Sequence, residues 1–326
     1  MKGNSIKEYN KGCLVISLDF ELMWGMLDLP NADIYKESNV RQVPLVIEEL
    51  LSLFTKYGIH ATFATVGFIF FKDSSDLLAN IPTIIPSYSN QKLNPYLGDF
   101  IKKIAEEDFD LFFQPGLIDR IKETEGMEIG THTFSHYYCW EKGQNIEQFE
   151  EDICKAKNIG EINGMDIKSI IFPRNNVSDE YLTICKKYGI TTYRGNPKKF
   201  FNQSKNKFGK IYKAGCRLFD NYINLSGKTS FSTDDIRRDG MTNIRASRML
   251  RPVSTKLRWL EPLRLKRIKN EMTIAAKKGE IYHLWWHPHN FGANIKENLV
   301  FLEELLKHYK YLNEKYGMKS LNMGEF

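Results

Sequence analysis

Paired cysteines are the first feature that this sequence lacks. Its five cysteines are odd in number and widely spaced, and no two of them form a C-x-x-C pair. They are Cys13, Cys139, Cys154, Cys185 and Cys216. Neither a disulfide framework nor a zinc knuckle is indicated, and a reducing compartment fits this pattern best.

Long apolar segments are also missing. The N-terminal stretch MKGNSIKEYNKG is polar and holds no apolar run of the roughly 7–15 residues that a secretion signal needs. No later window reaches the ~18 consecutive apolar residues of a membrane span. We therefore expect a cytoplasmic protein.

Charge of one sign is not in large excess. Lys and Arg number 46 against 40 Asp and Glu, a net charge of +6, which does not by itself indicate a nucleic-acid partner. Residues 237–269, however, include eleven basic residues and only two acidic ones, Asp239 and Glu261. This basic region is either an ordinary solvated surface or a contact for a diphosphate or a membrane surface. It contains no recognisable reading motif, so we expect no nucleic acid.

Alternating strand and helix patterns run along the 326 residues. Short apolar runs predict strands over residues 13–20, 61–67, 127–133, 167–173, 191–195 and 281–286, with a last one at 318–323. Helical periodicity covers residues 43–57, 115–125, 146–163, 179–188 and 296–316. This alternation predicts an α/β fold with a parallel sheet, open or closed into a barrel.

Two stretches interrupt the alternation. Residues 72–97 are rich in Ser, Asn and Pro and are typical of an insertion. Residues 198–278 hold a polar, loop-rich part and then a basic part with helical character. We expect one domain over residues 1–326, with an insertion or small basic subdomain at about 198–278.

Polar side chains gather at the ends of the predicted strands. They are Asp19, Glu21, His132, His136, Arg174 and His287. Parallel α/β folds assemble their sites at the carboxyl ends of the strands. We therefore interpret these residues as parts of one site.

The spacing of His132 and His136 could bring two imidazoles to one metal, from successive helical turns or from a compact loop. The pair alone is weak evidence, because a chance H-x-x-x-H is common in a chain with seven histidines. The polar neighbours Thr131, Thr133 and Ser135 argue against two core histidines and could orient the rings.

Asp19 and Glu21 flank Phe20, so on an extended backbone their carboxylates point to the same side, about 6–7 Å apart. The plain alternative is a pair of solvated acids at a strand end. In a shared site, one acid could bind metal while the other acts as a base.

The segment HLWWHPH at residues 283–289 is unusually rich in functional side chains. We predict that His287 is a general acid, that His283 is a core histidine and that His289 lies on the surface. We also predict that Trp24, Trp285 and Trp286 bind substrate as an aromatic wall for a sugar, although aromatic side chains at strand ends are often core plugs.

These stretches together resemble the polysaccharide deacetylases of the NodB-homology, carbohydrate esterase type. The matching segments are residues 17–21 (SLDFE), 132–136 (HTFSH), 172–176 (FPRNN) and 284–288 (LWWHP), and the resemblance spans roughly residues 13–290. The second and last segments match the family's motifs fully. The first has Phe20 where the family has a second Asp, and the third has Arg174 after Pro173 rather than before a proline.

The resemblance implies a distorted (β/α) barrel with about seven parallel strands and insertions. It implies a hydrolase of carbon–nitrogen bonds other than peptide bonds, which removes an acyl group, N-acetyl in the simplest case, from an amino sugar. A divalent metal, zinc by expectation, would be held by His132, His136 and Glu21, or by Asp19 in place of Glu21. Asp19 would otherwise be the base, paired with Arg174, and His287 the acid.

The expected substrate is a nucleotide-linked or lipid-linked amino sugar, a precursor of a cell-surface polysaccharide. The basic region at 237–269 could then contact the inner face of a membrane. Two other interpretations stay open: a metal-free amidase acting on a small amide, and an inactive carbohydrate-binding protein.

Overall fold

Ten strands form one sheet in the computed structural model, which describes residues 11–29, 32–197, 220–224, 227–238 and 240–326. The strands are β1 (Cys13–Phe20), β2 (Ala61–Thr65), β3 (Met127–Thr131), β4 (Ser169–Ile170), β5 (Thr192–Tyr193), β6 (Arg237–Arg238), β7 (Met241–Asn243), β8 (Arg248–Met249), β9 (Ile281–Trp286) and β10 (Lys319–Leu321). Their order is β6-β7-β5-β4-β3-β2-β1-β9-β8, and β10 also pairs with β1. Every pairing is parallel except that of β6 with β7.

The two ends of this sheet are joined by one extended segment. The Ile244 and Ala246 amides donate to carbonyls in and just after β5, whereas the Ser247 amide donates to the His283 carbonyl of β9. The segment from β7 to β8 therefore crosses from one end of the strand order to the other, and the sheet curls around a common axis. The predicted distorted barrel is confirmed. Its strand order contains eight parallel strands rather than about seven, because the crossing segment contributes two of them, β7 and β8.

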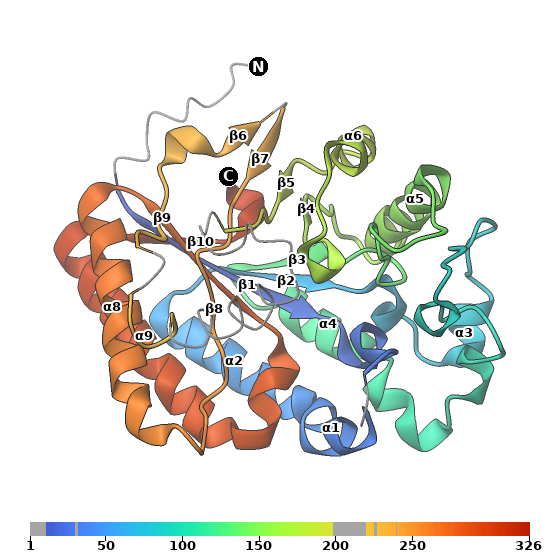
Figure 1. Cartoon of the computed structure of the whole chain (residues 1–326), viewed down its shortest axis with the longest axis horizontal. Helices are drawn as coiled ribbons and strands as arrows, with labels where there is room; N and C mark the ends of the chain where they lie inside the picture. Colours follow the sequence, from blue (N-terminus) through green and yellow to red (C-terminus); the bar gives the residue numbers. More distant parts are fainter. Residues whose placement is uncertain (1–10, 30–31, 198–219, 225–226, 239) are drawn as a thin grey trace, which may run out of the picture.

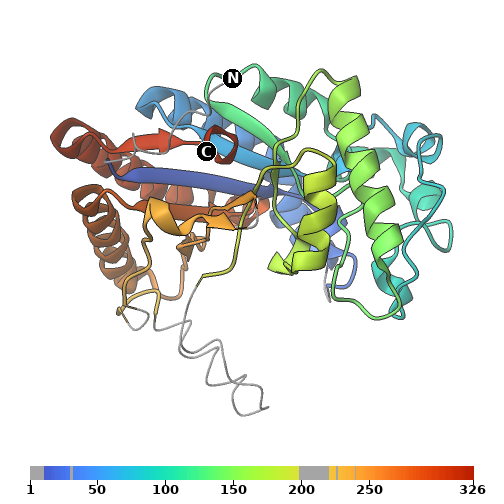
Figure 2. The same ribbon diagram turned by 90° about the horizontal axis from the view of Figure 1, so that it is seen from above.

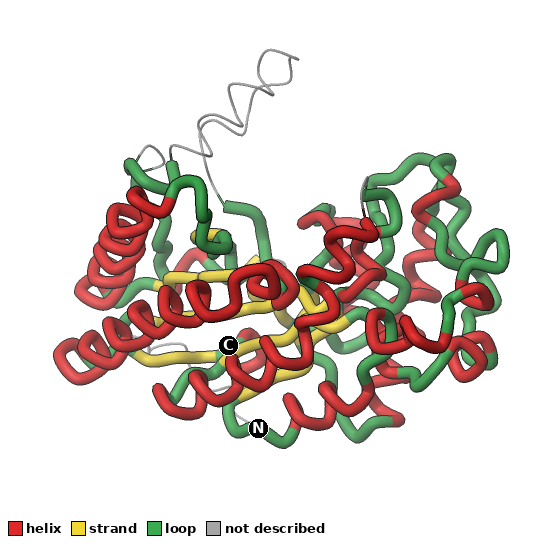
Figure 3. Tube along the Cα trace, turned by 90° about the horizontal axis from the view of Figure 1, so that it is seen from below, coloured by secondary structure: helices red, strands yellow, loops and turns green. Residues whose placement is uncertain are grey.

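Helices form the outer layer around the strands (Figure 3). They are α1 (Ala32–Ser38), α2 (Val43–Tyr57), α3 (Ser74–Leu78), α4 (Pro115–Lys122), α5 (Ile146–Ile162), α6 (Asp179–Lys187), α8 (Glu261–Lys278) and α9 (Ile295–Tyr316). Figures 1 and 2 show α8 and α9 together on one side of the sheet and α5 with α6 on the other. None of the described helices combines the length and the apolar character needed to span a membrane.

Helix α2 has a clear apolar periodicity, which is why it could be predicted from the sequence. Its apolar residues recur at helical spacing and form one buried stripe, which includes Val43, Ile47, Leu50 and Phe54. The helix ends at Gly58, whose φ of 62° is the left-handed conformation that glycine adopts at little cost. All eight residues of β1 are buried, as expected of a central barrel strand with helices outside it and packed side chains inside the barrel.

Strands β4 and β5 are shorter than the predicted segments 167–173 and 191–195. The Ser-rich stretch 72–97 contains α3 and a short 3-10 turn. In the region 198–278, the described residues form β6, β7 and β8 of the main sheet and the outer helix α8. Residues 198–219, including Cys216, lie outside the described residues.

Candidate metal centre and active site

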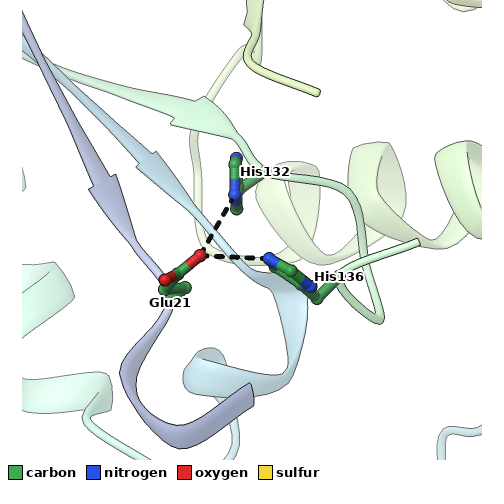
Figure 4. Close-up of side chains that lie close together, drawn as sticks. All are labelled: Glu21, His132 and His136. Atoms are coloured by element: carbon green, nitrogen blue, oxygen red, sulfur yellow. Dashed lines mark hydrogen bonds and ion pairs between the residues drawn. The ribbon is translucent and has the colours of Figure 1, made fainter. Parts of the chain in front are cut away.

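Three side chains meet at the carboxyl edge of the central strands (Figure 4). Glu21 follows β1, His132 follows β3, and His136 lies four residues further along. Glu21 Oε2 is 3.0 Å from His136 Nε2 and 3.4 Å from His132 Nε2. One ligand atom from each residue lies within 4.8 Å of the other two, and all three residues are buried. The geometry therefore brings together the three residues expected to bind metal.

A compact loop, rather than a helix, carries the two histidines. Thr133 and His136 have φ values of 66° and 58°, the left-handed conformation that is uncommon outside glycine. Thr133 Oγ1 accepts a 2.6 Å hydrogen bond from the Tyr137 amide, which closes the turn. Backbone strain of this kind persists where the surroundings hold it, and it is frequent at functional sites.

Asp152 of α5 holds this loop from behind. Its carboxylate accepts hydrogen bonds from the Phe134 amide (2.7 Å), the Ser135 amide (3.0 Å) and Ser135 Oγ (2.5 Å). Burial raises the pKa of Asp152 to about 6, although these three donors oppose the shift. A buried carboxylate is costly unless it is fully hydrogen-bonded, so Asp152 and the loop fix one another.

Neighbouring groups also orient the ligands. His132 Nδ1 lies 2.7 Å from the Ile171 carbonyl, which can only accept, so Nδ1 carries a proton and Nε2 is the nitrogen that faces Glu21. A Cβ added at Gly25 would lie 2.2 Å from Glu21 Cδ. Only glycine therefore leaves room for the Glu21 carboxylate in this position.

The protonation states suit a cation. Burial alone would raise the pKa of Glu21, but the His287 charge and hydrogen bonds from His132 and His136 hold it well below its usual range. Burial lowers the pKa of His136. An ionised carboxylate and neutral imidazoles are the forms that bind metal. Two histidines and one carboxylate fit zinc or a similar divalent ion and leave positions for water and substrate.

Asp19 lies beside the three candidate ligands and is held by an arginine that the sequence analysis missed. Arg194 Nη1 is 2.6 Å from Asp19 Oδ1, and Arg194 Nη2 is 2.7 Å from Oδ2. Arg194 is fully buried, stacks over Trp285 at 4.2 Å and also donates to Asn175 Oδ1. Burial would raise the pKa of Asp19, but the Arg194 charge outweighs it, so the pKa lies below its ordinary value.

The predicted pairing of Asp19 with Arg174 is wrong. Arg174 Nη2 is 2.7 Å from Asp28 Oδ2, and its guanidinium lies 4.3 Å from the centre of the Tyr138 ring. Arg174 has a φ of 56° at a tight turn, which directs a partly exposed side chain away from Asp19. The segment at 172–176 still contributes to the site through Asn175, which contacts Arg194.

This difference can be tested with two matched substitutions. Arg194→Met leaves the Asp19 carboxylate buried without its partner, so we expect hydrolysis to fall by at least about 100-fold, the lower range for loss of a positioned acid or base. We expect Arg174→Met to change kcat/KM by less than about threefold, because an exposed ion pair contributes little. Equal losses in the two variants would contradict this assignment.

His287 faces the carboxylates from the end of β9, the strand that pairs with β1. Its Nε2 lies 3.6 Å from Asp19 Oδ2 and 3.5 Å from Glu21 Oε1. Its Nδ1 is 3.3 Å from Asn290 Oδ1, and the Asn290 amide nitrogen donates to Tyr35 Oη at 3.0 Å. Because Nδ1 faces Asn290, Nε2 is the nitrogen that can exchange a proton with a substrate.

The two neighbouring histidines have different roles. His283 is a core histidine as predicted, with Nε2 2.8 Å from Ser17 Oγ and Nδ1 3.0 Å from the Ile244 carbonyl. The prediction of a surface position for His289 is wrong, because His289 is buried and its ring stacks on His287 at 4.9 Å. Burial lowers the pKa of His283 and that of His289 to about 3. His289 is therefore an uncharged side chain that packs against the ring of His287.

Of the three tryptophans predicted to bind substrate, two are core side chains. Trp24 is fully buried and its Nε1 donates to the Phe112 carbonyl at 2.7 Å. Trp286 is fully buried and stacks on Phe291. Trp285 alone is partly exposed, and its ring lies 5.8 Å from that of His287. The prediction of an aromatic wall is therefore wrong for Trp24 and Trp286, whose rings are covered by the core.

A second test concerns Asp152. Replacing Asp152 by Asn puts an amide group where three donors converge, so the loop that carries the histidines loses its best partner. We expect metal affinity to fall by roughly 10- to 100-fold, the usual effect of losing an orienting group. Metal titration followed by competition with a chelator measures this change. Ser135→Ala removes one of the three hydrogen bonds and should have a smaller effect; the reverse order would refute the role given to Asp152.

Comparisons with known proteins agree with this architecture. Residues 33–193 match the family model described as "Polysaccharide deacetylase". The matched residues include His132 and His136, whereas Asp19, Glu21 and His287 lie outside them. No match was found among curated proteins.

Solved structures with a similar fold include a protein from Mycobacterium smegmatis described as a polysaccharide deacetylase. It is 12% identical, with a TM-score of 0.54, and the alignment covers 97% of this chain and 89% of that one. The chitin deacetylase of the fungal pathogen Colletotrichum lindemuthianum is 11% identical, with a TM-score of 0.45 and coverage of 97% and 87%. At these identities the likeness to the first structure concerns the fold, and the family model concerns the sequence. Through residues 33–193, which match its family model, the chain belongs to the polysaccharide deacetylase family.

Proposed function

We propose that this protein is a metal-dependent hydrolase that removes an acyl group, N-acetyl in the simplest case, from an amino sugar. The observation that carries the proposal is the convergence of Glu21, His132 and His136 beside two further groups suited to proton transfer. These groups are Asp19, fixed by Arg194, and His287, fixed by Asn290. Geometry of this kind has little use in a protein that only binds sugar.

Glu21, His132 and His136 would hold the ion. A divalent ion bound there would polarise the acyl carbonyl and lower the pKa of water toward ~7. Zinc fits the donor set best, since two imidazoles and one carboxylate are a common catalytic zinc set.

Asp19 is the proposed base. Its carboxylate is kept ionised by Arg194 and would accept the proton of the attacking water. The bidentate contact also prevents rotation of the carboxylate, so the accepting oxygen is held in one direction. Glu21 rather than Asp19 is the proposed metal carboxylate, because Asp19 is already engaged by Arg194 and Glu21 faces both histidines.

His287 is the proposed acid. Its side chain is 20% exposed, so Nε2 can reach a bound substrate, and it would donate its proton to the nitrogen that leaves. Asn290 accepts from Nδ1 and keeps the ring in this orientation. Trp285 lies beside His287 and offers the only partly exposed indole of the three considered for a sugar face.

The proposal extends to the origin of the substrate. We propose a nucleotide-linked or lipid-linked amino sugar, used for a cell-surface polysaccharide, and a cytoplasmic protein that contacts the inner face of the membrane through residues of the basic region. The basic region supports this extension, since phosphate-bearing substrates and anionic lipids both favour Lys and Arg.

Acetate release tests the proposal. The purified protein would be stripped with a chelator, reloaded with zinc, and assayed on neutral and phosphate-bearing N-acetyl amino sugars. We expect activity to disappear with the metal and to return with it. Activity that survives complete metal removal would favour the metal-free amidase, and sugar binding without any hydrolysis would favour the inactive binding protein.

A further inference from the structure

A cavity of about 440 Å³ is lined in part by Asn290, the residue that contacts His287. Its polar wall consists of Asn221, Tyr222, Arg251, Ser254, Arg264 and Asn290, and no acidic side chain is among the described residues that line it. The volume lies within the range of roughly 300–1,000 Å³ that small-molecule sites occupy. The cavity is therefore large enough for a substrate group, and two arginines are part of its lining.

Asn290 connects this cavity to the catalytic groups. It lines the cavity and is also the residue that contacts His287 Nδ1. An acid that protonates the leaving nitrogen must lie on the side of the leaving amine, opposite the acyl group. The cavity is thus on the side where the sugar, and whatever is attached to it, would extend.

Arg264 is built into the cavity wall. It is buried, its guanidinium lies 4.2 Å from the centre of the Phe301 ring, and its Nη1 donates to the Arg251 carbonyl at 2.5 Å. Glu261 lies 2.5 Å from Nη2 and balances its charge. The Nε of Arg264 is buried and has no hydrogen-bond partner among the described residues. A buried donor of this kind is costly unless a ligand accepts a hydrogen bond from it.

Arg251 supplies a second guanidinium at the exposed side of the same cavity. With the hydroxyls of Tyr222 and Ser254 and the amide of Asn221, the cavity offers several hydrogen-bond donors beside its two guanidinium groups. Guanidinium and hydroxyl donors of this kind bind the oxygen atoms of a phosphate group through charge-assisted hydrogen bonds.

We propose that this cavity is a subsite for a phosphate group attached to the amino-sugar substrate on its leaving-group side. The inference rests on the proposed function for the position of the sugar, but the binding of phosphate by the cavity does not depend on hydrolysis. The phosphate could belong to a nucleoside diphosphate or to a lipid carrier.

Binding and kinetics test the subsite separately. Inorganic pyrophosphate is titrated calorimetrically into the full-length protein, the Arg251→Gln variant and the control Lys310→Gln, which removes an exposed charge on α9. We expect about tenfold weaker binding in Arg251→Gln and no change in the control. No pyrophosphate binding by the unsubstituted protein, or equal binding by all three proteins, would overturn the subsite even if the enzyme is active.

The kinetic arm compares an N-acetyl amino sugar with its nucleoside-diphosphate derivative. Arg251→Gln should raise KM about tenfold for the derivative and leave the neutral sugar unchanged. Equal changes for both substrates would overturn the subsite while leaving the deacetylase proposal intact. Absence of hydrolysis with every substrate would instead refute the proposed function, and the pyrophosphate titration would still decide the subsite.

The rim of the same cavity carries a second, independent feature. Because α8 leads into β9, the residues before α8 lie at the edge of the barrel where β9 ends and the active site opens. Trp259 is 74% exposed there, and Leu263, the third residue of α8, is 49% exposed. Exposed apolar side chains of this size, close together, mark an interaction surface.

The charges around these two side chains are positive. Lys256, Arg258 and Lys266 are exposed, whereas Glu261, the one acidic residue between positions 251 and 270, is buried against Arg264. Tryptophan and leucine within a field of Lys and Arg complement the interface of an anionic bilayer. We infer that this rim, formed by Lys256, Arg258, Trp259, Leu263 and Lys266, docks on an anionic membrane surface, which brings a lipid-linked phosphate to the cavity.

Vesicle sedimentation tests the docking rim. The full-length protein is mixed with vesicles of phosphatidylcholine alone or with about one third phosphatidylglycerol. We expect binding to the anionic vesicles only, and about tenfold weaker binding for the double variant Trp259→Ala, Leu263→Ala. The control Ile162→Ala removes an equally exposed apolar side chain at the end of α5 and should bind as before. Equal binding by the double variant and the control would overturn the rim, as would absence of binding to anionic vesicles.

A lipid-linked substrate in the same vesicles separates the two sources of phosphate. We expect higher kcat/KM for the lipid-linked sugar than for the nucleotide-linked one, with the difference lost in the rim double variant. A preference for the nucleotide derivative would contradict the membrane rim and leave the phosphate subsite standing.

Discussion

We expect the His132→Ala variant to lose stoichiometric metal and hydrolytic activity together. His132 supplies one of the three converging ligand atoms, and the remaining pair, Glu21 and His136, cannot complete a stable site. The loss should exceed the roughly 10- to 100-fold that removal of an outer partner causes. Metal content after dialysis and acetate release from the same preparation measure both quantities.

A folding defect must be separated from loss of the ligand. His132 Nδ1 donates to the Ile171 carbonyl, so its removal also leaves a buried acceptor without a partner. His136 is a cleaner position, because its Nδ1 has no hydrogen-bond partner among the described residues. His136→Asn keeps a residue type that tolerates the left-handed conformation and should lose metal as well. His60→Ala, at the ion pair with Glu325, is the matched histidine control. Stoichiometric metal in both ligand variants would refute the ligand set.

The second large effect is expected for Asp19→Asn. An amide cannot accept the proton of the attacking water, so we expect kcat to fall by roughly 10²- to 10⁴-fold while metal stays bound. The expected result therefore differs from that of the histidine variants in its metal content. Steady-state kinetics and metal analysis on one preparation give both readouts.

The outcome of the Asp19 substitution also decides between the two carboxylates. Metal lost from Asp19→Asn but kept in Glu21→Gln would make Asp19 the ligand and reverse the assignment. Arg194 complicates the variant, since its guanidinium would face an uncharged amide. A double variant with Arg194→Met shows whether the effect comes from this unpaired charge: if it does, the double variant should be more active than Asp19→Asn alone.

The elements with the clearest periodicity were predictable almost to the residue. Strands β1 and β9 and helix α2 have the predicted bounds, because each is a continuous apolar run or a regular stripe with a clear stop. Strands β4 and β5 are only two residues long, although flanking residues such as Ile171 and Arg194 still donate backbone hydrogen bonds to the neighbouring strand. Apolar composition marks the whole extended segment and does not show where pairing ends.

The position of polar residues after strands located most of the site, but it did not reveal Arg194. This arginine follows β5 directly, yet the predicted strand ran to residue 195 and placed it inside the strand. Asp152 lies in the middle of a helix, where nothing local distinguishes it from an ordinary surface acid. Its partners are on another segment, and only the tertiary structure brings them together.

Strand geometry alone could have excluded the prediction that both Trp285 and Trp286 bind substrate. Successive side chains of a strand point to opposite faces, so Trp285 and Trp286 cannot both face one site. The structure has Trp286 packed on Phe291 in the core and Trp285 beside Arg194. The same alternation explains why Asp19 and Glu21, two residues apart, both lie within 4 Å of His287.

The most direct test of this account is a crystal structure of the zinc-loaded protein with anomalous diffraction measured at the zinc edge. We predict one strong peak about 2.0–2.2 Å from a Glu21 oxygen and from the Nε2 atoms of His132 and His136. Asp19 should remain paired with Arg194 outside the coordination sphere. A peak coordinated by Asp19 instead of Glu21, or no peak between the two histidines, would contradict the proposed metal centre.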